Sequence, residues 1–269
     1  MRFIILLVAF VLNLPLSALA SETIPPIKAS EQTFDYDAAL AFSQASIGNE
    51  VTDFSLVSAK GKSVNLSDFR GKPLIISMIY TSCYQICPMT TRHLSTVVEK
   101  AREALGHDSF DIAIIGFDTQ VDTPAAMQYF ANKQGISDKG WHLLSVRQND
   151  VQNLASETGF LYETSSNGFD HLIQATILDA DGIVYRQVYG QAFETPKLVD
   201  PLIELVLGRP SPMDSLLTNL GSKIKLFCTT YDPVRDGYYF DYSLFIGMFI
   251  GGSIILLTGF ALVRERQKG

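Results

Sequence analysis

A run of 21 residues without a charge, 243–263, constrains this chain more than any other feature of its sequence. At about 1.5 Å per residue, a helix of that length spans the roughly 30 Å hydrocarbon core of a bilayer, where a helix satisfies its own backbone hydrogen bonds. Three basic residues follow the run within 264–269, whereas Asp232, Asp236 and Asp241 precede it with Arg235 as the one basic residue among them. The positive-inside rule therefore predicts a transmembrane helix at 243–263, a cytoplasmic tail at 264–269, and a main domain outside the cytoplasm.

The other end of the chain indicates how that domain reaches the outside. Arg2 precedes an apolar stretch, 3–16, and small residues ending at Ala20 complete the pattern of a cleavable signal peptide, 1–20. An uncleaved N-terminal anchor is the alternative. A leader with a single arginine is unlike a mitochondrial targeting segment. We therefore expect a single-pass protein of the bacterial inner membrane with its main domain in the periplasm.

Charge excludes one class of function. Lys and Arg number 21 against 28 Asp and Glu, a formal net charge of −7, and no run of basic residues occurs. A surface that binds a nucleic-acid backbone needs clustered positive charge. We therefore expect no nucleic-acid partner.

Between the two apolar ends, short apolar runs alternate with amphipathic stretches, which predicts α/β layering. The predicted strands are 74–80, 111–117, 142–145, 173–178 and 183–188, and the predicted helices are 88–105, 124–133 and 194–207. Asp181-Gly182 predicts a hairpin between the last two strands, and Pro201 is expected to kink or restart the last helix. A strand-helix-strand unit at the start, followed by a β-hairpin and a closing helix, is the arrangement of a thioredoxin-like domain.

The domain organisation follows from these patterns. The thioredoxin-like domain is expected at 47–209, after a tether at 21–46 that contains one short helix near 36–46. A juxtamembrane segment, 210–242, links the domain to the transmembrane helix.

Cys83 and Cys87 lie between the most apolar predicted strand and the longest predicted helix. In an open α/β sheet, reacting groups gather at the carboxyl end of a central strand, and a helix N-terminus there stabilises a thiolate. Cysteines four residues apart in one helical turn could bind one metal ion or form a disulfide. A structural disulfide, or two buried free thiols, are the alternatives without chemistry.

Four segments resemble the Sco/SenC family: IYTSCYQICP, GFDTQVDTP, GWHLLS and FDHLIQATILDADG. The resemblance covers about residues 47–208 and implies a thioredoxin-like fold and a role in assembling the binuclear copper centre of cytochrome c oxidase. It also implies that Cys83, Cys87 and His171 are copper ligands. Two thiolates and one imidazole suit Cu(I) and also allow Cu(II). A site with three ligands is open on one side and can pass its copper ion to a partner, whereas a structural zinc site usually has four ligands.

The sequence departs from the family at two places. The tripeptide 84–86 separates the cysteines where many relatives have a proline and an acidic residue, so a role of that acid is in doubt. Asp118 and Asp122 are present without the usual proline and arginine between them; Asp118 would either assist the site or act as a capping or solvated loop acid. Asp170 is a candidate to orient the imidazole of His171.

The function expected is that of a membrane-anchored copper chaperone, rather than an enzyme, that delivers copper to the copper-bearing subunit of cytochrome c oxidase. Other copper chaperones or thioredoxin-like reductants are further candidate partners. The alternative is an extracytoplasmic thiol-disulfide oxidoreductase that keeps the oxidase's copper-ligand cysteines reduced.

A peroxidase of the same fold is disfavoured, because Tyr84 and Tyr80 stand three residues before Cys87 and Cys83, where a threonine would be expected. Cys228, beyond the predicted domain, is left open between a copper relay, an intermolecular disulfide and no role.

Overall fold

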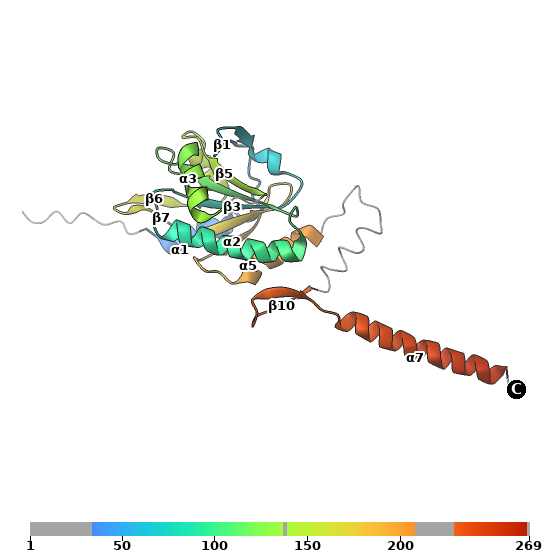
Figure 1. Ribbon diagram of the computed structural model, residues 1–269. Coiled ribbons are helices and arrows are strands. Elements are labelled where there is room, and N and C mark those ends of the chain that lie inside the picture. Colours follow the sequence, from blue (N-terminus) through green and yellow to red (C-terminus); the bar gives the residue numbers. More distant parts are fainter. Residues whose placement is uncertain (1–33, 137–138, 208–228, 268–269) are drawn as a thin grey trace, which may run out of the picture. The chain divides into compact units, whose positions relative to one another are not determined.

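The computed structural model describes residues 34–136, 139–207 and 229–267 (Figure 1). The predicted signal peptide, the first half of the predicted tether and Cys228 lie outside these residues. The described part contains a seven-stranded sheet in the order β2-β1-β5-β4-β3-β8-β9 and two two-stranded sheets, β6-β7 and β10-β11.

The strands of the large sheet are β1 (Ser55–Ser58), β2 (Ser63–Asn65), β3 (Leu74–Ile79), β4 (Asp111–Gly116), β5 (Trp141–Ser145), β8 (Gln174–Leu178) and β9 (Val184–Tyr189). The small sheets consist of β6 (Tyr162–Ser165), β7 (Gly168–His171), β10 (Thr229–Asp232) and β11 (Gly237–Phe240). The helices are α1 (Tyr36–Ala45), the short 3-10 helix η1 (Leu66–Phe69), α2 (Ile86–Leu105), α3 (Pro124–Gln134), α4 (Val151–Glu157), α5 (Thr195–Leu207) and α7 (Ser243–Arg266).

The centre of the sheet is parallel and fully covered. β3 pairs in parallel with β4, and β4 with β5, while β8 and β9 run antiparallel to their neighbours. Every residue of β3 and β4 is buried, as their largely apolar sequences predict. Because parallel strands end at the same edge of a sheet, the loops after β3 and β4 meet at one edge. That edge is where Cys83 follows β3.

The long helix after β3 is amphipathic. The residues that it buries recur every three or four positions and include Leu94, Val98 and Ala101. α2 lies beside α5 (Figure 1). It begins at Ile86, two residues before the predicted start, so that Cys87 lies within its first turn.

Other helix signals are confirmed in part. The side chain of Thr123 accepts a hydrogen bond from the Ala126 amide at 3.2 Å, with Pro124 in the first turn, so α3 begins as predicted. α5 continues through Pro201 as one helix, and the restart that proline suggested does not occur.

Short elements escaped the sequence prediction. β1, β2, α4 and the two strands of the β6-β7 hairpin have three to seven residues each, too few to show a period. The connection from β8 to β9 is also longer than a two-residue turn. Asp179 Oδ1 accepts hydrogen bonds from the amides of Asp181 and Ile183, both at 2.9 Å, and Gly182 has φ +80°. The predicted antiparallel pairing is nevertheless confirmed.

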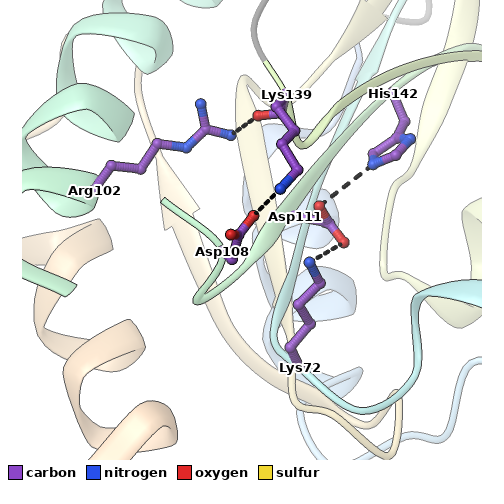
Figure 2. A network of polar contacts seen from close by, with 6 residues as sticks. All are labelled: Lys72, Arg102, Asp108, Asp111, Lys139 and His142. Carbon is purple, nitrogen blue, oxygen red and sulfur yellow. Dashed lines mark hydrogen bonds and ion pairs between the residues drawn. The ribbon is translucent and has the colours of Figure 1, made fainter. Parts of the chain in front are cut away.

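At the amino ends of the central strands, away from the cysteines, lies a polar network (Figure 2). Asp111 pairs with Lys72 at 2.9 Å and with His142 at 3.4 Å, and Arg102 donates to the Lys139 carbonyl at 2.7 Å. Because His142 is bound in this network, it has a structural role.

α7 matches the predicted transmembrane segment closely. Within it, Phe245–Arg264 has the length and the apolar composition that crossing a membrane requires, and no other helix in the described part of the chain does. The predicted tail and the orientation of the helix remain predictions.

Candidate metal centre

The two cysteines contact each other where β3 gives way to α2. The Cys83 amide donates to the Tyr80 carbonyl at 3.1 Å, which closes a turn after β3. The Cys87 amide, in the first turn of α2, donates to Cys83 Sγ at 3.2 Å. Both thiols are free; Cys83 is half-buried and Cys87 is 4% exposed. A helix N-terminus therefore points a backbone N–H at the more accessible sulfur.

The two thiols differ in acidity. The Cys87 thiol donates a hydrogen bond to Cys83 and, although burial opposes it, this bond together with the Cys87 N–H lowers the pKa of Cys83 from 9.0 to about 5. The same hydrogen bond, helped by burial, raises the pKa of Cys87. At neutral pH Cys83 is therefore a thiolate and Cys87 a thiol.

His171 ends β7, in a hairpin that sequence reasoning missed. Its Nδ1 lies 2.7 Å from the Leu172 carbonyl oxygen. A carbonyl only accepts hydrogen bonds, so Nδ1 carries the proton and Nε2 has a free lone pair for a ligand. Burial lowers the pKa of His171, which favours the neutral ring. The orienting hydrogen bond thus comes from a backbone carbonyl rather than from Asp170.

Aromatic side chains surround the imidazole. The ring centroid of His171 lies 5.1 Å from that of Phe160, 5.8 Å from Phe117 and 6.1 Å from Tyr80. Tyr162 and Phe169 pack against Phe117 in the same cluster. The sequence carried a signal for this aromatic cluster, because aromatic residues recur on both sides of the hairpin turn that precedes the histidine.

The hairpin backbone also rests on this cluster. Gly168 has φ +117°, and a Cβ at that position would lie 3.0 Å from Tyr80 Cε2. Only glycine allows both the conformation and the close approach. Tyr80, at the end of β3, therefore connects the cysteine turn to the histidine hairpin.

Cys87 and His171 line one small cavity of about 10 Å³, roughly the space of a single water molecule. Among the described residues, however, no three Cys, His, Asp or Glu side chains lie close enough together to hold one metal ion. Cys83 thus meets Cys87, and Cys87 shares a cavity with His171, but the three predicted ligands do not converge. A larger cavity of about 510 Å³, between β9 and α5, contains no cysteine.

The sheet mixes parallel and antiparallel strands, and the cysteine pair lies between its central strand β3 and the helix α2 that follows. Together, this sheet and this position of the cysteines are those of a thioredoxin-like protein. Residues 43–206 match the SCO1/SenC family model, so the chain belongs to the SCO1/SenC family. It is 26% identical over 147 residues to the SCO1 protein homolog of Bacillus subtilis (strain 168), covering 52% of this chain and 74% of that relative.

Solved structures share the fold. A protein of Aquifex aeolicus VF5, described as a candidate electron transfer protein, is 29% identical with a TM-score of 0.56, covering 62% of this chain and 97% of that one. Arabidopsis thaliana ScoI, solved with copper bound, is 20% identical with a TM-score of 0.52, covering 59% and 98%. BsSco, which has a disulfide switch and belongs to the Sco family of cytochrome c oxidase assembly proteins, is 20% identical with a TM-score of 0.54, covering 60% and 96%.

Proposed function

We propose that this chain is a membrane-anchored copper carrier for the assembly of cytochrome c oxidase, with Cys83, Cys87 and His171 as the copper ligands. The observation that carries the proposal is the Cys83 thiolate in contact with Cys87, at a cavity that His171 also lines. Copper bound to ScoI, and the assembly role of the Sco family to which BsSco belongs, support it.

Copper is the cargo in this proposal, and the donor set fits it. Thiolate sulfur and imidazole nitrogen are ligands that Cu(I) prefers. Cys83 is already ionised, whereas Cys87 must release its proton when copper binds. His171 offers Nε2 because its Nδ1 proton is held by the Leu172 carbonyl. Since the three side chains do not converge in this structure, loading requires a shift of the histidine hairpin or of the cysteine turn.

We further propose that α7 anchors the carrier with its main domain outside the cytoplasm. Arg264 and Arg266 end the helix, whereas Arg235 is the one basic residue in 229–242, and the positive-inside rule places the more basic flank in the cytoplasm. A carrier tethered in this way would deliver copper to a partner in the same membrane.

Thiol-disulfide exchange is a second candidate function, which the unequal acidity of the thiols favours. The Cys83 thiolate would attack a substrate disulfide, form a mixed disulfide and release one substrate thiolate. Cys87, after losing its proton, would attack the Cys83 sulfur and release the second substrate thiol. The product is a Cys83–Cys87 disulfide, and two electrons pass to the substrate.

Anaerobic Cu(I) titration of the reduced, detergent-solubilised full chain separates the two functions. Cys83→Ser, Cys87→Ser and His171→Ala are compared with His93→Ala, a matched control because a ring nitrogen of His93 also lies 2.7 Å from a backbone carbonyl, that of Phe193. We expect one copper per chain, weakened by the first three changes and kept by the control. If His171→Ala binds copper as wild type does while the thiol pair still reduces a disulfide, the carrier proposal fails and exchange is favoured.

A further inference from the structure

A buried carboxylate joins the cysteine turn to the loop after β4. Asp122 is 2% exposed. Its Oδ1 accepts hydrogen bonds from the Thr81 amide at 2.7 Å and from Thr81 Oγ1 at 2.6 Å, and its Oδ2 accepts from the Asp118 amide at 2.9 Å. A carboxylate is costly to bury without partners, whereas hydrogen bonds to a charged acceptor are about twice as strong as neutral ones. The three donors therefore define the position of this side chain.

Thr81 is the residue through which Asp122 reaches the site. It lies inside the turn that the hydrogen bond from the Cys83 amide to the Tyr80 carbonyl closes. Asp122 holds Thr81 by both its backbone and its side chain, so the turn cannot rotate at this residue without breaking two hydrogen bonds. The direction in which the turn presents Cys83 therefore depends on Asp122.

Asp122 is itself well fixed. Its amide donates to the Asp118 carbonyl at 2.7 Å. β4 passes so close that a Cβ on Gly116 would lie 2.5 Å from Asp122 Cβ, so a larger residue there would displace the carboxylate. The next residue, Thr123, caps α3. Asp118 contributes its backbone amide and carbonyl to this arrangement, Thr123 supplies the cap of α3, and Asp122 Oδ1 accepts both hydrogen bonds from Thr81.

We propose that Asp122 is a positioning residue for the copper site: by holding Thr81, it sets the place of Cys83 Sγ relative to Cys87. The proposal deepens the proposed copper function and rests on it. The hydrogen bonds of the Asp122 carboxylate go to Thr81 and to the Asp118 amide rather than to a proposed copper ligand, so Asp122 positions Cys83 through the turn.

The test removes one hydrogen bond at a time in the detergent-solubilised full chain. Thr81→Val deletes the hydroxyl donor at similar volume, and Thr81→Ser keeps it. Thr176→Val is the matched structural control, because the Thr176 hydroxyl is also buried and donates to Gln187 Oε1 at 2.8 Å. Asp122→Asn keeps an acceptor for Thr81 but turns a donor toward the Asp118 amide.

Three quantities are measured for each variant. They are the Cu(I) affinity, by competition with a chromophoric chelator; the thiol-disulfide equilibrium constant of the Cys83–Cys87 pair in glutathione buffer; and the melting temperature without copper. The second needs no copper, so it tests the positioning of the sulfurs even if the copper function is wrong.

We expect Thr81→Val and Asp122→Asn to weaken Cu(I) binding and to change the thiol-disulfide equilibrium constant, each by about tenfold, the effect of one such hydrogen bond. Thr81→Ser should leave the Cu(I) affinity and the thiol-disulfide equilibrium constant at their wild-type values. Thr176→Val should lower the melting temperature without changing either of these two quantities. The proposal is overturned if Thr81→Val matches Thr81→Ser in both quantities, or if Thr176→Val changes them as much. If wild type binds no copper but the thiol-disulfide constants still separate as expected, the copper function fails while the positioning role of Asp122 stands.

Discussion

Replacing Cys87 with alanine is expected to make the Cys83 thiol much less acidic. In the native chain, the hydrogen bond from the Cys87 thiol is the largest of the effects that lower the pKa of Cys83 from 9.0 to about 5. Alanine removes that donor and leaves the backbone N–H that also points at the sulfur. The pKa should therefore rise, but only part of the way to 9.0.

The size of the rise follows from the hydrogen bond that is lost. A hydrogen bond to a charged group contributes about 1.5–3 kcal/mol, and one pKa unit corresponds to about 1.4 kcal/mol. Because Cys83 is only half-buried, solvent replaces part of the lost bond and the effect lies toward the lower end of that range. We expect a rise of about one to two units, which at pH 6 reduces the thiolate fraction from about 90% to between about 50% and 10%.

The assay is the rate of alkylation by iodoacetamide as a function of pH, on a Cys228→Ser background so that Cys83 is the reactive thiol. Only the thiolate reacts, so the rate should rise with pH through the pKa of Cys83 and level off above it. Wild type should show a midpoint near pH 5, and Cys87→Ala a midpoint between about 6 and 7. Cys87→Ser, which keeps a donor, should fall between them. A Cys87→Ala midpoint still near 5 would refute the hydrogen-bond account and assign the acidity to the helix N-terminus.

Three further predictions concern stability, followed in urea by the fluorescence of the single tryptophan of the detergent-solubilised chain. Phe117 is 2% exposed among the aromatic rings, and Phe117→Ala should lower the free energy of unfolding by about 3–5 kcal/mol. Tyr129→Ala, at a 68% exposed position of α3, should cost less than about 0.5 kcal/mol, and equal losses would contradict the packing. Burial opposes ionisation of Asp111, but its histidine and lysine partners lower its pKa overall, so its charge stabilises the fold above the unfolded pKa of about 3.9 and the benefit is lost as the pH falls through the lower folded value. Asp111→Asn should therefore destabilise the protein at pH 7 and much less at pH 3; a difference that does not change with pH would disprove this. Gly168→Ala should cost more than Gly190→Ala, because the φ values of +117° and +102° are similar but only the first Cβ would meet an aromatic ring, at 3.0 Å, and equal costs would rule that contact out.

Much of the fold is readable from the sequence, because its signals are local. A strand buried on both faces, such as β3 or β4, is apolar at most of its positions, and the sequence shows this directly. The capped start of α3 and the antiparallel β8-β9 pair also follow from residues close together in the chain. The cysteine pair was located for the same reason, since its place between a strand and a helix is a property of adjacent residues.

The histidine shows where local reasoning stops. The sequence offered His171 as a ligand only through its resemblance to a family, and that role remains a prediction. The rings around it belong to Tyr80 after β3, Phe117 after β4 and Phe160 before β6, which are separated along the chain and meet in the folded structure. Which nitrogen is free was decided by a backbone carbonyl that no sequence pattern marks.

The chain's own sequence determined an apolar C-terminal helix, a parallel central sheet and two thiols between a central strand and a long helix, because each depends on the character of consecutive residues. Only the tertiary structure decided that Asp122, 41 residues from Thr81, holds the turn that presents Cys83. A buried carboxylate takes its partners from whatever donors the packing places within hydrogen-bonding distance. The acidity of Cys83 likewise depends on a contact between two sulfurs that spacing allows but does not require.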